Sequence, residues 1–214
     1  MRITKKYTVK LTEALKYKLL CWSQQFEEVV WLDSNEESNL QSKSTYKAIL
    51  AVDAFTAIKT DYHQAFDQLE EYQSKTKDWL FGYLSYDLKN DSEDLQSNNI
   101  DGLDFPDLFF FQPKKLFLLK GNQVVIHYLN LCDDEVDEDW DTILAWVPNE
   151  TIDSSVVTVQ PRISKESYVK KVSTLLDHLH RGDLYEANFC MEFYAENTTI
   201  NPLDKFDKLN AISQ

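Results

Sequence analysis

The chain has 214 residues, of which 43% are hydrophobic and 13% aromatic, and this is ample material for a folded core. Its formal net charge of −14 argues against partners that need a basic surface, so we expect no binding to nucleic acid or to a membrane. The sequence has no apolar run of about 18 residues, no signal-peptide core and only three widely spaced cysteines, which predicts a soluble, cytoplasmic protein with reduced thiols.

The first half of the chain alternates strand-like and helix-like apolar patterns. In chain order these patterns predict a strand over residues 1–11, a helix over 12–26, strands over 27–34 and 46–52, a helix over 61–77 and a strand over 78–90. Gly82 lies within the last of these strands, where a glycine indicates a bulge or a close approach between two backbones.

The third quarter of the chain carries a hairpin signal. Residues 105–131 predict two strands joined by a turn at Gly121 and Asn122, because two apolar runs flank that pair. An acidic run, expected to be solvated, leads into a predicted short helix over residues 140–147. Residues 154–161 then indicate either a strand or a linker.

Two helices are predicted near the end of the chain. The first runs from Ser164, as N-cap, to Gly182, as C-terminal stop, because apolar residues recur on one of its faces. The second begins at Asn201, followed by Pro202 in its first turn. It ends without a stop signal, as expected of a truncated chain.

Between these helices, residues 185–193 alternate apolar and polar side chains. This alternation predicts a strand that follows directly after the helix stop. On it, Tyr185, Ala187 and Phe189 are expected to face a core, whereas Glu186 and Asn188 are expected to face the opposite side.

The order of elements predicts an α+β fold with mixed, largely antiparallel sheets and packed helices, because strands and helices are intermixed and several strands are joined by hairpins. The four glycines are too far apart for a phosphate-binding loop, and the four histidines lack metal-site spacing. Motifs alone therefore assign no catalytic residue and no metal ligand.

Residues 164–193 resemble the chorismate-utilising enzymes, which include the first components of aminodeoxychorismate (para-aminobenzoate) synthase and of anthranilate synthase. The family pattern is a helix with an early tyrosine, then Gly-Asp, an aromatic residue, glutamine and a short strand that ends in an aromatic residue. The chain matches it at Tyr168, Gly182, Asp183, Tyr185 and Phe193. It departs from the pattern by carrying Glu186 where the family has glutamine.

Three upstream stretches extend the resemblance in the family's order. Residues 81–88 are similar to a glycine-containing strand that ends in Tyr-Asp, and residues 103–111 to the hydrophobic-Pro-Asp stretch that follows it. Residues 31–35 occupy the place of a leucine-containing motif that ends in serine. The resemblance implies the N-terminal part of the component I fold, with an α+β subdomain over residues 1–160 and the start of a truncated chorismate-binding domain over 161–214.

For the longer parent enzyme, the resemblance implies amination of chorismate with ammonia from a glutamine amidotransferase subunit. It also implies Mg²⁺, with its ligands and the catalytic residues outside this chain, so we expect the chain alone to be inactive. Glu186 and Asn188 are expected to face the missing half as scaffold residues.

The resemblance further implies an effector site for L-tryptophan, which some family members bind. Carried over by position, its candidates are Ser34, Lys43, Ser44, Thr45 and Tyr46. A family arginine falls at Thr45, and this departure leaves open the alternative that these residues only shape the sheet.

Two features favour the aminodeoxychorismate branch, which leads to folate, over the anthranilate branch. Asn188 stands where anthranilate synthases are apolar, and residues 79–90 are more similar to the aminobenzoate enzymes. The alternatives are a part of anthranilate synthase component I, or a non-catalytic module for tryptophan binding or protein interaction.

Overall fold

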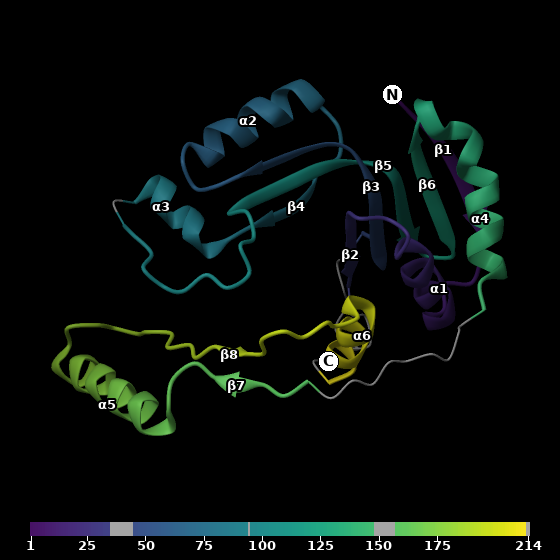
Figure 1. The fold of residues 1–214 in the computed structure, drawn as a ribbon. Coiled ribbons are helices and arrows are strands. Elements are labelled where there is room, and N and C mark those ends of the chain that lie inside the picture. Colours follow the sequence, from purple (N-terminus) through teal and green to yellow (C-terminus); the bar gives the residue numbers. More distant parts are fainter. Residues whose placement is uncertain (35–44, 94, 148–156, 213–214) are drawn as a thin grey trace. The chain divides into compact units, whose positions relative to one another are not determined.

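The computed structural model of the chain describes residues 1–34, 45–93, 95–147 and 157–212 (Figure 1). The chain separates into two units, Met1–Asn149 and Glu150–Ser213. The predicted division into residues 1–160 and 161–214 stays a prediction. Within the described residues, every helix falls short of the length and apolar content needed to cross a bilayer.

The first unit is built on an antiparallel sheet. Its strands follow the order β1-β6-β5-β3-β2. In addition, β4 pairs with residues 108–111 of β5, which β6 does not reach. The strands are β1 (Arg2–Thr8), β2 (Val29–Asp33), β3 (Ala48–Thr60), β4 (Phe81–Leu84), β5 (Leu108–Lys120) and β6 (Gln123–Leu129). The β5–β6 hairpin turns at Gly121, whose φ of 58° is the left-handed conformation that glycine adopts at little cost, and the predicted hairpin is confirmed.

A β-bulge interrupts the pairing of the two longest strands, β3 and β5. Their register shifts between Ala54 and Thr56, next to Asp53, whose φ is 62°. Past the bulge β3 continues to Thr60, so the predicted strand over residues 46–52 is too short. The reason is tertiary, because residues 54–60 pair with β5 although their apolar residues do not alternate strictly with polar ones.

Gly82 is the point of closest backbone approach between β4 and β5. A Cβ atom built there would lie 1.9 Å from the carbonyl oxygen of Phe109, so no other residue fits without moving the backbone. This confirms the close approach that the glycine predicts. The strand itself is shorter than predicted, because after Leu84 the chain turns into the 3₁₀ helix η1 (Tyr86–Leu88) and the helix α3 (Lys89–Ser92).

Two helices cover one face of the sheet (Figure 1). They are α1 (Glu13–Ser23) and α4 (Val136–Ala145), and α4 follows the 3₁₀ segment η2 (Asn130–Glu135). Thr12 caps α1 by accepting a hydrogen bond from the backbone N–H of Leu15. The helices bury Leu19, Phe117 and Tyr128 completely, and this is the main core of the unit.

The acidic run over residues 132–141, which extends into α4, is only partly solvated, and this corrects the expectation for it. Lys115 on β5 is only 4% exposed, and its Nζ lies 2.6 Å from carboxylate oxygens of Glu135 and Asp139. Asp139 also accepts a hydrogen bond from the Tyr128 hydroxyl at 2.8 Å. These contacts fasten α4 to the sheet, because a buried lysine needs charged partners.

The helix α2 (Ala65–Thr76) depends on a cap from a distant segment. The backbone N–H groups of Gln64 and Phe66 donate to the Asp91 carboxylate at 2.8 and 3.1 Å. Asp91 lies on α3, so the short helix α3 fixes the start of α2. A small cluster of Ala65, Leu88 and Leu108 packs beneath them.

In its described residues, 157–212, the second unit contains two helices and one strand pair. They are β7 (Gln160–Pro161), α5 (Lys165–Arg181), β8 (Phe193–Tyr194) and α6 (Pro202–Ile212). Both predicted helix starts are confirmed, because Ser164 Oγ accepts from the N–H of Ser167 and Asn201 Oδ1 accepts from the N–H of Asp204. Gly182, with φ of 81°, ends α5 as predicted.

The predicted strand over residues 185–193 is wrong. Only Phe193 and Tyr194 form a strand, paired with β7, and Tyr185 is 97% exposed rather than facing a core. Alternation predicts a strand only where a neighbouring strand can accept its hydrogen bonds, and within residues 157–212 the structure supplies such a partner to these two residues alone.

Candidate functional site

Ser34 follows the last residue of β2 and is fixed to the start of β3. Its backbone N–H and its hydroxyl both donate to the carbonyl oxygen of Lys47, each at 3.0 Å. Tyr46, next to Lys47, packs against the cluster that contains Phe111 and Leu116, whereas Thr45 is exposed. The structure thus brings Ser34 and Tyr46 to neighbouring strand ends.

The other effector candidates, Lys43 and Ser44, lie outside the described residues. A tryptophan site at these five positions therefore stays a prediction. Glu186 and Asn188, the scaffold candidates, are both exposed in the segment between α5 and β8, and their role also stays a prediction.

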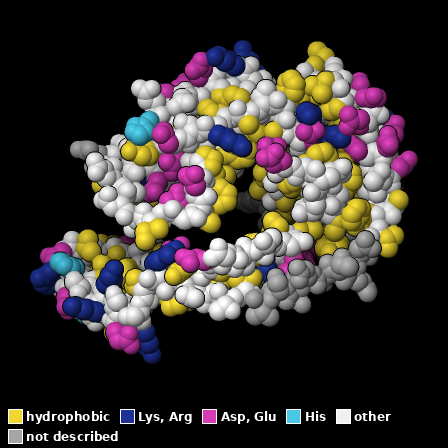
Figure 2. Space-filling model, in the orientation of Figure 1, with side chains coloured by type: hydrophobic (Ala, Val, Ile, Leu, Met, Phe, Trp, Pro, Cys, Tyr) yellow, Lys and Arg dark blue, Asp and Glu magenta, His cyan; other side chains and the backbone are white. Residues whose placement is uncertain are grey.

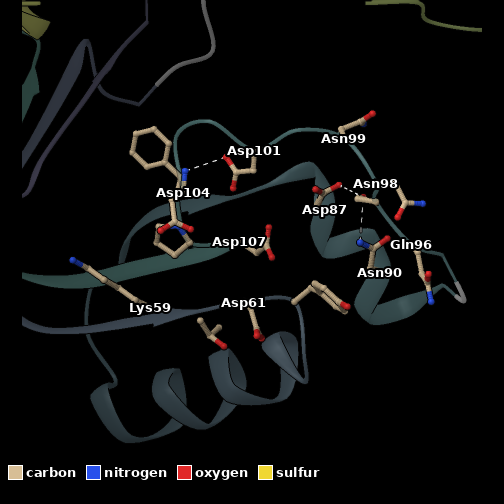
Figure 3. A pocket seen from close by; sticks show the side chains of 15 residues that line it. Lys59, Asp61, Asp87, Asn90, Gln96, Asn98, Asn99, Asp101, Asp104 and Asp107 are labelled. Atoms are coloured by element: carbon tan, nitrogen blue, oxygen red, sulfur yellow. Dashed lines mark hydrogen bonds between the residues drawn. The ribbon is translucent and has the colours of Figure 1, made fainter. Parts of the chain in front are cut away.

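A cavity of about 620 Å³ opens beside α3 in the first unit (Figure 3). It was not predicted from the sequence. Its wall comes from the end of β3, from η1 and α3, and from residues 96–107 before β5. The five carboxylates that line it are those of Asp61, Asp87, Asp101, Asp104 and Asp107.

Local hydrogen bonds hold several of these carboxylates in place, among them Asp87 and Asp101. Asp87 Oδ1 accepts from Lys89 Nζ at 2.7 Å and from Ser97 Oγ at 2.6 Å, and these bonds hold the pKa of Asp87 below its usual value. The backbone N–H groups of Leu103 and Asp104 both donate to Asp101 Oδ1 at 3.0 Å, and they lower the pKa of Asp101 in the same way. The cavity is therefore anionic at neutral pH.

The register of β4 and β5 explains how distant residues meet at this cavity. Because Leu84 pairs with Leu108, the chain brings Ser85 opposite Asp107, and Ser85 Oγ donates to Asp107 Oδ1 at 2.7 Å. The motifs that carry these residues are visible in the sequence, but their convergence is not. Their convergence could have been predicted only from the correct pairing of residues 81–84 with residues 108–111.

The carboxylates of this cavity do not form a metal site. Across the described ranges 1–34, 45–93, 95–147 and 157–212, no group of three or more His, Cys, Asp or Glu side chains could hold a metal ion. The resemblance implies Mg²⁺ with its ligands outside this chain, and that cofactor stays a prediction.

Comparison with known proteins identifies the family. Residues 14–214 match the chorismate binding enzyme family, so the chain belongs to that family. The sequence-based assignment to chorismate-utilising enzymes is thereby confirmed. A comparison with curated proteins finds no match.

Among solved structures, the chain is similar to anthranilate synthase component I from Streptococcus pneumoniae TIGR4. The two share 20% sequence identity with a TM-score of 0.63, over 84% of this chain and 48% of that chain. This similarity shows the fold and confirms the predicted α+β class. The chain thus spans about half the length of the protein it matches.

Proposed function

We propose that the chain is the N-terminal part of an aminodeoxychorismate synthase component I. The parent enzyme replaces the ring hydroxyl of chorismate with an amine, forming a C–N bond and releasing water, to give 4-amino-4-deoxychorismate for folate biosynthesis. A glutamine amidotransferase subunit supplies the ammonia. The observation that carries this proposal is the family match over residues 14–214.

In this proposal the first unit is a scaffold rather than a reaction centre. Its charged groups in the core, such as Lys115, are already paired, and no catalytic role is assigned to them. The Mg²⁺ of the parent enzyme would neutralise the substrate carboxylate through ligands other than the described residues. We place the enzyme in the cytoplasm.

The choice of the aminodeoxychorismate branch rests on the sequence. Asn188 and residues 79–90 support it, whereas the similar solved structure belongs to an anthranilate synthase component I. Anthranilate synthesis is therefore the alternative, and the two reactions give distinguishable products from the same substrate.

The test is an assay with chorismate, Mg²⁺ and an ammonium salt, followed by separation of the products. The gene product that joins this chain to the other half of the enzyme is expected to give 4-amino-4-deoxychorismate, and this chain alone is expected to give none. Turnover by the 214-residue chain would contradict the placement of the catalytic residues elsewhere. Anthranilate as product would contradict the branch.

A non-catalytic function in tryptophan binding is the second candidate. It is supported by the hydrogen bond that holds Ser34 to the carbonyl oxygen of Lys47, the neighbour of Tyr46. Calorimetry with L-tryptophan tests it, with Ser34→Ala as the variant. Binding by the chain that is weakened in the variant supports the effector site, and absence of binding contradicts it.

A further inference from the structure

Exposed apolar side chains gather along one segment of the first unit. Large apolar side chains that gather at an exposed surface indicate an interaction site. Seven of them lie within residues 83–105: Tyr83, Leu84, Tyr86, Leu95, Ile100, Leu103 and Phe105. Tyr86, Ile100 and Leu103 are 84%, 72% and 77% exposed.

This apolar segment is continuous with the acidic cavity. The Phe105 ring lines the cavity and meets the Tyr83 ring edge-on, with centroids 6.4 Å apart. Leu103 directly precedes Asp104, and Tyr86 directly precedes Asp87, so exposed apolar residues adjoin two of the cavity aspartates along the chain. The space-filling view shows acidic side chains gathered beside hydrophobic ones over the region of α2 and α3 (Figure 2).

The charge balance of this surface is negative. Among the described residues, the cavity lining contains one lysine, Lys59, and five aspartates. Lys89 lies nearby, but its ammonium group is bound by Asp87 and lies over the Tyr86 ring at 4.8 Å. A partner that covers this surface must therefore bring positive charge.

We propose that this apolar–acidic surface, formed by the seven apolar residues and the five cavity aspartates, binds a protein segment in which arginine or lysine alternates with apolar side chains. The cationic groups enter the cavity, and the apolar groups cover Tyr86, Leu103 and Phe105. This inference does not depend on the proposed function.

Other occupants fit the same surface less well. An anionic membrane or a nucleic acid would be repelled by the carboxylates. A second copy of this chain carries the same net charge of −14. A small cation would leave the exposed side chains of Ile100 and Tyr86 uncovered.

The test uses a synthetic peptide in which arginine, leucine, lysine and phenylalanine alternate, titrated into the chain at about physiological salt, where the Debye length is about 8 Å. Binding is expected. A peptide with serine at every apolar position is expected to bind at least roughly fivefold more weakly, because it lacks the apolar contacts.

Two double variants locate the binding surface. Asp101→Asn with Asp104→Asn is expected to weaken binding of the arginine–leucine peptide roughly fivefold, since each exposed charge contact contributes modestly. Asparagine at Asp104 suits its φ of 54°, so the fold is retained. Asp133→Asn with Asp134→Asn, two exposed residues of η2, removes the same charge elsewhere and is expected to leave the affinity unchanged.

Several outcomes would overturn the proposal. They are no binding of the arginine–leucine peptide, equal binding of the serine peptide, or equal weakening by the Asp133 and Asp134 control. Sedimentation of the chain gives a further check. A dimer that Leu103→Ser with Phe105→Ser converts to a monomer would show that this surface binds a second copy instead.

Discussion

The two units of the chain bury very different amounts of apolar surface. In Met1–Asn149, residues such as Leu19 and Phe117 have no exposed surface, and two helices close one face of the sheet. In Glu150–Ser213, every described residue stays at least partly exposed, although α5 carries a clear apolar stripe that includes Val169 and Leu176. The first unit thus has a core of its own, whereas the described part of the second does not.

This difference shows that the helices form without a neighbouring element, whereas a strand needs another strand beside it. α5 and α6 form in the second unit because their caps and their helical hydrogen bonds are local. The segment 185–192 forms no strand there, because a strand obtains its hydrogen bonds from a neighbour. The same alternating pattern gives a strand in β6, where β1 and β5 pair on both sides.

The largest loss of stability is expected for a substitution at Gly82, in the first unit. Gly82→Val places a side chain against the carbonyl oxygen of Phe109, so β4 must leave β5, and we expect the free energy of unfolding to fall by about 4 kcal/mol. Urea denaturation measures it. Gly102→Ala is the control, because a Cβ there meets nothing within 4 Å, and its effect should stay within about 0.5 kcal/mol. Equal costs at both glycines would refute the close approach.

A matched leucine pair compares the two units directly. Leu19→Ala in α1 removes a fully buried side chain and is expected to cost about 3 kcal/mol in unfolding free energy. Leu176→Ala in α5, where the leucine is 45% exposed, is expected to cost less than about 1 kcal/mol. A cost at Leu176 as large as that at Leu19 would show that the second unit has a core.

Replacing Lys115 is expected to have a smaller effect on the free energy of unfolding, and this effect depends on pH. Burial alone would lower its pKa, but hydrogen bonds to Asp139 and Glu135 outweigh burial and hold the pKa above the ordinary 10.5. Because the folded pKa is the higher one, the stabilisation is complete below pH 10.5 and is lost as the pH rises through the folded value. Lys115→Met should cost about 2 kcal/mol at neutral pH and remove this alkaline loss. An unchanged alkaline limb in the variant would contradict the role of Lys115.

The sequence predicted features that depend on near neighbours. Ser164, Gly182 and Asn201 were recognisable as helix signals, and Gly121 as a hairpin turn, because each acts within a few residues. The resemblance to the family also follows from short ordered motifs. The effector candidates were placed only by position along the sequence.

Features set by tertiary pairing were not predictable in this way. The burial of Lys115 depends on a carboxylate of α4 that is 24 residues away along the chain. The cavity depends on the register that joins Ser85 to Asp107, 22 residues apart. A strand pattern does not specify its partner, so the alternation over residues 185–193 predicts a strand although residues 185–192 have no strand to pair with in the described part of the chain.

Amide hydrogen exchange tests the contrast between the two units most directly. We expect slow exchange across β3, β5 and β6, and exchange near the unprotected rate over residues 185–192. Protection over residues 185–192 comparable to that of β5 would contradict it, because those amides would then have strand partners and the second unit a core of its own.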